Sequence, residues 1–222
     1  MDIVHSIERR AYDTTHRDRQ ADSTRRRIVE AAAELFVREG YAATSIAAIA
    51  GEAGVAVPTV YASLRSKANI LRAVVALGVR GDDEAATLAQ RDEWRAIEDE
   101  PDPPRQLARF ARLHREICER EAPVFAQIEA AAGGDAEATA LLAEHDRRRY
   151  ETQTRLAAAL RRGGALRPGL GAKRAADVIW TLASERTYLA LVRDRGWRPA
   201  EYERWVAEQL AAALLAEEGG GG

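Results

Sequence analysis

The chain has 222 residues, of which 46% are hydrophobic and 31% charged, so it is long enough to bury a sizeable core. Its formal net charge of −2 excludes a polycation, and a role on nucleic acid would need locally placed charge. The single cysteine, Cys118, excludes an intrachain disulfide, and no apolar run reaches the roughly 20 residues that cross a bilayer, so we expect a cytoplasmic protein without membrane contact.

The N-terminal part of the chain is expected to contain an arm and then a helix. Residues 1–20 are polar and mixed in charge, which is typical of a mobile arm. A helix is predicted from Asp22 to Gly40, where glycine can terminate it. Its apolar residues share one face of a 3.6-residue period: Ile28, Ala32, Leu35 and Phe36.

Two short helices are predicted next, at about Ser45–Glu52 and Pro58–Leu64, with Gly54 in the turn between them. Glycine reaches positive φ without a Cβ clash, so it suits this reversal of the chain. Pro58 suits a first helical turn, because its missing N–H would have no partner there. We interpret this pattern as a helix-turn-helix, whose short exposed second helix can enter the major groove of DNA. The alternative is a surface helical hairpin that packs and does nothing more.

The candidate DNA contacts are of two kinds. Thr44, Tyr61 and Lys67 are placed to meet phosphates through a hydroxyl, a phenol and an ammonium at a helix N-terminus. Base reading would fall to Thr59, Ser63 and, through a thymine methyl group, Val57. Because the groove-facing surface has few hydrogen-bonding side chains, indirect readout or the arm has room to contribute. The full candidate set is Thr44, Val57, Pro58, Thr59, Tyr61, Ser63 and Lys67.

The rest of the chain is predicted to be helical. A helix starts at Lys67 after the cap Ser66 and continues to about Ile97, and Glu98–Arg105 is a linker in which Asp102 can cap the next helix. Pro123 is read as another helix start. The later helices are expected at about Ala136–Arg162, Ala172–Asp194 and Pro199–Ala216.

These elements predict an all-α architecture of roughly nine helices without a strand pair. The N-terminal three-helix head and the C-terminal helical body divide the chain into four parts. The parts are the arm at 1–20, the helix-turn-helix domain at 21–66, the ligand-binding and dimerisation domain at 67–217, and a flexible tail at 218–222.

The run RIVEAAAELFVREGYAATSIAAIAGEAGVAVPTVYASLRSKANIL, Arg27–Leu71, resembles the TetR family of bacterial transcriptional repressors. The resemblance includes the Gly-Tyr-x-x-Thr entry, the Ala-Gly-Val turn, Thr-Val-Tyr and Ser-Lys. It departs from the family at Leu64, where a phenylalanine is usual, and at Val57, where a polar or basic residue is common. It implies phosphate contacts at Thr44, Tyr61 and Lys67.

The resemblance also implies how the chain would work. A small-molecule effector in the body would displace the helix that starts at Lys67 and change the separation of two heads. Seven body residues are candidates for lining the cavity, and they would suit an apolar or aromatic effector with His114 as its polar anchor. The alternative for each is ordinary core packing. The candidates are Trp94, Phe110, His114, Phe125, Ile128, Tyr150 and Trp180.

A homodimer is expected, because two heads are needed to read a palindromic operator in double-stranded DNA. Apolar stripes on the last two helices would form a four-helix bundle, unless each stripe packs inside its own subunit. Glu185 and Arg186 interrupt the first stripe and either pair across the two-fold axis or face solvent. The candidate interface residues are Val178, Leu182, Leu189, Tyr202, Trp205, Val206 and Leu210.

No pattern for catalysis, a cofactor or a metal is expected. His114, Glu116 and Cys118 follow one another at spacings of two, which point away from each other on a helix, so we expect no nucleophile–base pair. The sequence contains neither HxxxH nor CxxC spacing. The sequence therefore predicts a ligand-responsive DNA-binding regulator, a repressor in the sense of the family that it resembles, and not an enzyme. The alternative is a helical protein-interaction module whose head has lost DNA affinity.

Overall fold

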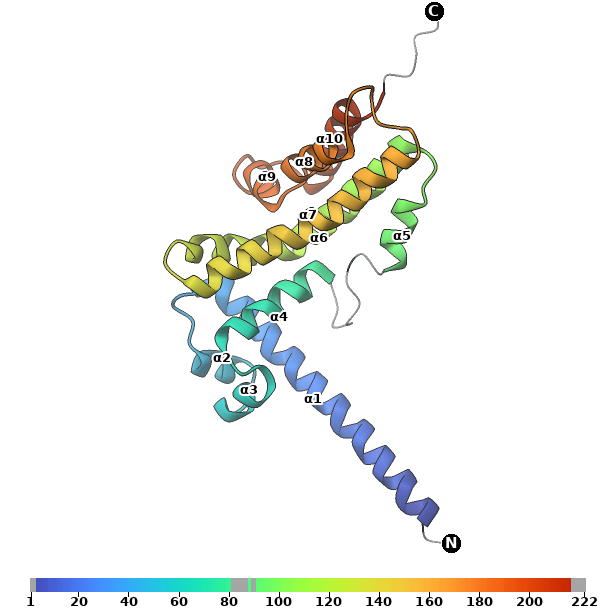
Figure 1. Cartoon of the computed structure of the whole chain (residues 1–222). Helices are drawn as coiled ribbons and strands as arrows, with labels where there is room; N and C mark the ends of the chain where they lie inside the picture. Colours follow the sequence, from blue (N-terminus) through green and yellow to red (C-terminus); the bar gives the residue numbers. More distant parts are fainter. Residues whose placement is uncertain (1–2, 81–87, 89–90, 217–222) are drawn as a thin grey trace, which may run out of the picture. The chain divides into compact units, whose positions relative to one another are not determined.

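The computed structural model describes residues 3–80, 88 and 91–216, apart from the side chains of residues 3–19 and 80 (Figure 1). Within these residues the chain is helical, and its extended structure is one isolated antiparallel bridge between Leu166 and Leu215. The predicted all-α class is confirmed. The chain divides into two compact units, a head at Met1–Ala76 and a body at Leu77–Gly222.

The head contains α1 (Ile3–Glu39), α2 (Ile46–Glu52), α3 (Val57–Leu64) and the first turns of α4 (Lys67–Arg80). The arm expected over residues 1–20 is instead helical backbone from Ile3 onward, because no glycine or proline precedes Gly40 to stop it. Gly40 ends α1 at a φ of +89°, as predicted.

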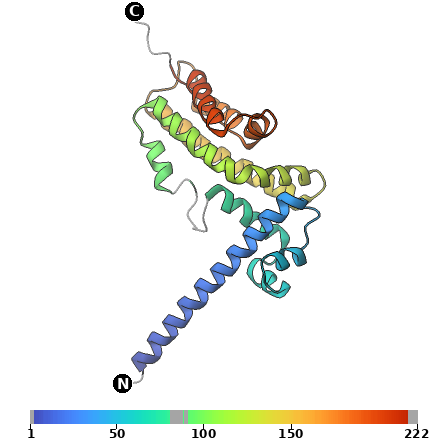
Figure 2. The same cartoon turned by 180° about the vertical axis from the view of Figure 1, so that it is seen from behind.

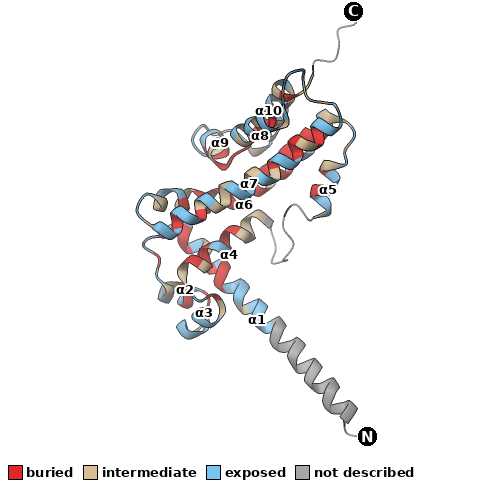
Figure 3. Cartoon of the chain, viewed as in Figure 1, coloured by how far each residue is buried: buried red, intermediate tan, exposed pale blue. Residues whose placement is uncertain are grey.

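The apolar face predicted for α1 forms one side of the head's core. Ile28, Leu35 and Phe36 are buried there, and Figure 3 shows the described part of α1 changing from exposed to buried toward its C-terminal end. The short helices and α4 complete this core with buried side chains. They contribute Ile49, Val60, Leu64, Ile70, Leu71 and Val74.

The two compact units meet inside α4, between Ala76 and Leu77, whereas the predicted domains, which stay a prediction, meet at the start of this helix. The reason is that the first turns of α4 bury Leu71 and Val74 within the head. The predicted continuation of this helix toward Ile97 falls partly on residues 81–87 and 89–90, which lie outside the described residues, as does the expected tail at 218–222.

The body contains α5 (Asp92–Glu98), α6 (Pro103–Ala132), α7 (Ala136–Arg162), α8 (Ala172–Leu182), α9 (Glu185–Tyr188), the π-helix η2 (Leu189–Arg193) and α10 (Pro199–Leu214). The long helices α6 and α7 lie side by side and run in opposite directions (Figure 2). α8 packs mainly on α7, and α10 packs mainly on α6. Asp102 caps α6 by accepting a hydrogen bond from the Arg105 N–H at 3.1 Å, as predicted.

Two predicted helix boundaries in the body are wrong. Pro123 does not start a helix but lies inside α6, with its ring on the exposed side. The missing N–H therefore leaves the carbonyl of Glu119 without its usual i+4 donor at a position close to water. The helix expected over Ala172–Asp194 is broken at Ala183, after which Ser184 caps α9 by accepting from the Thr187 N–H at 3.1 Å.

Among the described helices, none is by itself long and apolar enough to span a membrane. The pair α2 and α3 meets that measure only when both helices are taken together across the 104° bend between them.

Two glycines of the helix-turn-helix form a matched pair for testing the turn. Gly54 has a φ of +64°, whereas Gly51 lies in α2, and a Cβ at either position would meet nothing within 4 Å. Gly54→Ala therefore adds only backbone strain and is expected to destabilise the head by about 1–2 kcal/mol. Gly51→Ala is expected to be neutral or to stabilise it by up to about 1 kcal/mol. Native-state hydrogen exchange in α2 and α3 measures both effects, and equal protection in the two variants would contradict the assigned turn.

Candidate functional site

The helix-turn-helix is formed by α2 and α3, which meet at 104°. Ser45 caps α2 by accepting a hydrogen bond from the Ala48 N–H at 3.0 Å, and the Val55 N–H donates to the Ala50 carbonyl at 2.9 Å to close the turn. Val60 and Leu64 are buried and hold α3 on the head. The opposite face of α3 is therefore left outside the head's core.

The outward face of α3 carries most of the side chains predicted to read DNA. Val57 is 37% exposed and Tyr61 is 51% exposed, both high values for large apolar or aromatic residues. Pro58 and Thr59 are also exposed, and Ser63 is half-buried. The structure thus leaves four of these residues exposed on α3 and Ser63 half-buried, while their contact with DNA stays a prediction.

Thr44 does not lie where a phosphate contact would need it. Only 2% of this residue is exposed, and its hydroxyl donates to the carbonyl of Gly40 at 2.8 Å. The hydroxyl therefore stabilises the turn between α1 and α2. The neighbouring Ser45 is exposed at the N-terminus of α2, where free N–H groups favour an anion. Sequence reasoning missed Ser45, although a serine before an apolar helix is a capping signal.

Lys67 is also engaged within the head. Its ammonium donates to the carbonyl of Ala42 at 3.2 Å and lies 4.4 Å from the centre of the Tyr41 ring. It therefore sits beside the loop that leads to α2. A second cation that sequence reasoning missed is Arg25, whose guanidinium donates to the carbonyl of Ser63 at the end of α3 at 3.4 Å.

The residues predicted to line a ligand cavity lie in two groups. Trp94, Phe110 and His114 are buried in a row of ring contacts, with centroids 6.2 Å and 6.1 Å apart, and His114 Nε2 lies 3.0 Å from the Tyr202 hydroxyl. The others lie farther along α6 to α8, where Phe125 packs against His145 at 5.5 Å. This group is completed by Ile128, Tyr150 and Trp180.

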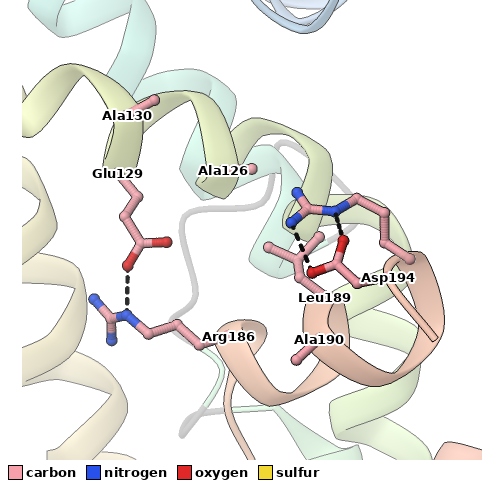
Figure 4. A pocket seen from close by; sticks show the side chains of 8 residues that line it. Ala126, Glu129, Ala130, Arg186, Leu189, Ala190 and Asp194 are labelled. Carbon is pink, nitrogen blue, oxygen red and sulfur yellow. Dashed lines mark hydrogen bonds and ion pairs between the residues drawn. The ribbon is translucent and has the colours of Figure 1, made fainter.

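None of these seven residues lines the pocket found among the described residues of α6, α9 and η2. This pocket, of about 460 Å³, opens between α6 and the segment formed by α9 and η2 (Figure 4). Its apolar lining consists of three alanines and Leu189, and its charged lining forms two ion pairs, one joining Arg186 to Glu129 and one joining Arg193 to Asp194 at 2.7 Å. Five of the candidates are buried inside the body: Trp94, Phe110, His114, Phe125 and Ile128. Trp180 is half-buried with the Arg149 guanidinium 4.7 Å from its ring, and the Tyr150 hydroxyl donates to Asp177 at 2.9 Å.

The residues predicted to face a second subunit are not equally available. Tyr202, Val206 and Leu210 are fully buried within the single chain, and Leu189 is buried as well, so these positions belong to the body's own core. The burial does not fit the expectation that they meet a partner. Three candidates remain partly exposed: Val178, Leu182 and Trp205.

His114 and Cys118 form a contact that the sequence analysis overlooked, because they are four residues apart on α6. Cys118 Sγ lies 3.5 Å from His114 Nε2, and the cysteine is fully buried. Burial raises the pKa of the Cys118 thiol well above its usual value, and burial lowers the pKa of His114 to about 4. The pair is therefore a neutral thiol beside a neutral imidazole, which is the opposite of an activated nucleophile.

A buried polar cluster joins three helices of the body. His145 of α7 lies between two carboxylates, with Nδ1 3.2 Å from Glu121 of α6 and Nε2 3.4 Å from Glu185 of α9. Arg149 Nε lies 3.5 Å from the second oxygen of Glu185. Glu185 thus pairs inside its own chain, neither across a two-fold axis nor with solvent, and Arg186 pairs with Glu129.

Within this cluster the pKa values of Glu121 and His145 are raised, and the pKa of Glu185 is lowered. Burial raises the pKa of Glu121 to about 8. Burial opposes the charged form of His145, but Glu121 and Glu185 outweigh it and raise its pKa to about 9. Burial likewise opposes ionised Glu185, but its contacts with His145 and Arg149 lower its pKa to about 2. Sequence reasoning could not assemble this cluster, because its members are far apart in the chain.

Comparison with known proteins identifies the head. Residues 28–74 match the family model for bacterial regulatory proteins of the tetR family, which confirms the resemblance predicted from Arg27–Leu71. No curated protein matches the chain in sequence.

Solved structures identify the fold of the whole chain. The SmeT–triclosan complex has a TM-score of 0.70 at 19% identity and covers 88% of this chain and 93% of its own. FadR from Bacillus subtilis in complex with stearoyl-CoA has a TM-score of 0.68 at 19% identity, covering 84% and 97%. NalD from Pseudomonas aeruginosa, the secondary repressor of the MexAB-OprM multidrug efflux pump, has a TM-score of 0.66 at 20% identity, covering 88% and 98%. The chain has the fold of TetR-family transcriptional regulators.

The buried His114 predicts a pH dependence of stability. Its pKa of about 4 lies below the value of 6.5 expected in the unfolded chain, so the unfolded state binds more protons between these values. Stability from this site is full above pH 6.5 and is lost as the pH falls toward 4. From pH 7 to pH 5 the wild type is expected to lose about 1–2 kcal/mol more than His114→Gln. Urea unfolding of both proteins at the two pH values measures this, and parallel losses would contradict it.

Proposed function

We propose that the chain is a homodimeric, ligand-responsive transcription regulator that represses by binding a palindromic operator. The observation that carries the proposal is the exposed face of α3, which Gly54 and the two buried anchors Val60 and Leu64 turn away from the head. Such a helix fits the roughly 12 Å width of the major groove. A regulator of this kind works in the cytoplasm and needs no catalytic residue.

The surface of α3 favours a particular mode of DNA binding. Thr59 offers a hydroxyl to base edges, and Val57 offers methyl groups that suit thymine. Tyr61 reaches the phosphate backbone with its phenol, and the exposed N-terminus of α2 at Ser45 replaces Thr44 as the second phosphate contact. With so few hydrogen-bonding side chains, much of the specificity comes from DNA shape.

Dimerisation involves the partly exposed apolar residues of α8 and α10. Val178 and Leu182 lie on α8 and Trp205 on α10, and each keeps part of its surface open to a partner. Burying such side chains on both subunits is favourable by roughly 25 cal/mol per Å² before the cost of association. Two heads held in this way read two half-sites about 34 Å apart or a near multiple.

The effector is a small molecule bound by the body. Among the similar solved structures, SmeT is in complex with triclosan, FadR is in complex with stearoyl-CoA, and NalD is a repressor of an efflux pump. These relatives support a largely apolar effector and a repressor role here. Trp94, Phe110, Phe125 and Ile128 are packed against their neighbours, so an effector that reaches them must displace core contacts. That requirement links binding to a movement of the body helices.

A second candidate function is supported by the same helix face. Ala56, Val57, Pro58 and Ala62 give this exposed surface an apolar character that also suits a protein partner. In this alternative the head is a protein-interaction module without DNA affinity.

The phenol of Tyr61 separates the two candidates. Tyr61→Phe removes one hydroxyl from the exposed face and is expected to weaken operator binding by about 1 kcal/mol, or about fivefold in Kd. Tyr150→Phe removes a hydroxyl from the surface of the body and is the matched control, with unchanged affinity expected. Fluorescence anisotropy on an operator selected from the neighbouring intergenic DNA measures both. If no intergenic DNA is bound at low salt, the interaction module is the better assignment.

The dimer is tested by placing a charge on its proposed surface. Val178→Glu is expected to convert a particle with the mass of two chains into one with the mass of a single chain, because an unpaired carboxylate is costly in an apolar interface. Val37→Glu is the control, since Val37 is 45% exposed on α1. Light scattering after size exclusion gives the masses, and circular dichroism verifies the helix content. A wild type of single-chain mass at micromolar concentration would contradict the dimer.

A further inference from the structure

Glu121, His145 and Glu185 form a set of metal-ligand side chains that the function proposed above does not use. They come from α6, α7 and α9, and one ligand atom from each lies within 4.8 Å of the others. We propose that this cluster binds a divalent transition-metal ion of the zinc class inside the body.

The spacing of the three residues is close to what such an ion requires, and small side-chain shifts would complete it. Zinc binds imidazole nitrogen and carboxylate oxygen at about 2.1 Å, so two ligand atoms on one ion lie at most about 4.2 Å apart. The contacts of His145 with Glu121 and with Glu185 are already 3.2 Å and 3.4 Å long. Because the two contacts use different ring nitrogens, the ion takes one nitrogen, and a rotation of the ring with small side-chain shifts brings both carboxylates to it.

The hydrogen bonding within the cluster is incomplete, which is the second observation for a ligand. Glu121 is only 1% exposed, yet neither of its carboxylate oxygens has a hydrogen-bond partner among the described residues. His145 Nε2 and one oxygen of Glu185 are in the same condition. When His145 is protonated, its contacts with Glu121 at 3.2 Å and with Glu185 at 3.4 Å are ion pairs, so an ion at this place competes with that proton. Buried carboxylate oxygens without donors are costly unless a cation meets them.

The surrounding charges can hold the ligands in place. Arg149 Nε faces the second oxygen of Glu185 at 3.5 Å, which leaves the first oxygen toward His145. Arg149 also lies 3.6 Å from Asp146, and Arg186 lies 3.8 Å from Asp146 at the outer side. An ion that binds here displaces the proton of His145, after which the carboxylates of Glu121, Glu185 and Asp146 face the ion together with the guanidinium groups of Arg149 and Arg186. Outer groups of this kind fix the orientation of metal ligands.

The chemistry of the ligands selects the class of ion. One imidazole and two carboxylates favour zinc, cobalt, nickel or manganese, whereas copper(I) would prefer sulfur, and Cys118 is not one of the three. The His145 side chain keeps 10% of its surface exposed, which gives the ion a route from solvent. With three protein ligands, a fourth position is left for water or for a donor atom of the effector.

The site is also connected to α4, the helix that continues from the head. A Cβ added at Gly78 would lie 3.2 Å from the Cβ of Glu121, and the Arg120 side chain donates to the Gly78 carbonyl at 3.1 Å. A shift of Glu121 toward an ion therefore acts directly on the end of α4. Any effect of the ion on DNA binding rests on the proposed function, but binding of the ion itself does not.

The experiment uses the full chain after removal of metals by a chelator and dialysis. Calorimetric titration with zinc and the visible absorption of bound cobalt are expected to show one ion per chain with nitrogen and oxygen ligands. Glu121→Gln and His145→Gln are expected to lose at least 100-fold in affinity. The matched controls Glu116→Gln and His114→Gln, a carboxylate that pairs with Arg112 and a buried imidazole elsewhere on α6, are expected to bind as the wild type does.

Two further measurements keep the result decisive. Circular dichroism verifies that each variant is folded, and Glu121→Asp, which keeps a carboxylate but shortens it, is expected to bind with intermediate affinity. Gly78→Ala removes no ligand, yet it should weaken binding by displacing Glu121. No saturable binding by the folded wild type, or equal affinity in the Gln variants, overturns the proposal. Neither result bears on the operator, since no DNA is present in these titrations.

Discussion

The arrangement of the body helices depends on the burial of the Glu185 carboxylate. A carboxylate that is 2% exposed must be paired, because an isolated charge in an apolar core costs many kcal/mol. The pairing needs His145 and Arg149 on one face of α7, and it needs the chain to break between α8 and α9 so that Glu185 turns inward. Removing His145 or Arg149 would leave an uncompensated charge on Glu185. The break between α8 and α9, the π-helix η2 and the face of α7 that carries these two partners therefore depend on one another.

In the head, two buried side chains are enough to position the short helix α3. Val60 and Leu64 hold α3 by one face, and the turn at Gly54 sets its direction. Everything on the other face is then free to differ without loss of the fold. This explains how α3 can have so apolar a surface while keeping the geometry of a regulator head.

Local signals in the sequence were enough for much of this structure. The turn glycine, the prolines in first helical turns and the cap Asp102 act on adjacent backbone, so their effects could be predicted without knowing the fold. Pro123 was misread for the same reason, since whether a proline interrupts a helix depends on what surrounds it. An apolar stripe on a helix predicts that the stripe is buried, but it does not predict whether the same chain or a partner buries it. Tyr202 is buried by its own chain. Thr44 turned inward and the cluster around His145 formed from three helices, both of which depend on tertiary contacts that periodicity does not contain.

The distribution of indole rings gives the molecule a natural optical label. All four tryptophans lie in the body, and Trp197 and Trp205 pack edge to face at 6.0 Å, so tryptophan emission, excited apart from tyrosine, reports on this unit and not on the head. Trp180 lies 4.7 Å below the guanidinium of Arg149, the same side chain that faces Glu185. Its quantum yield and emission wavelength should therefore respond to the charge state of the core beside it, without any dye or engineered reporter.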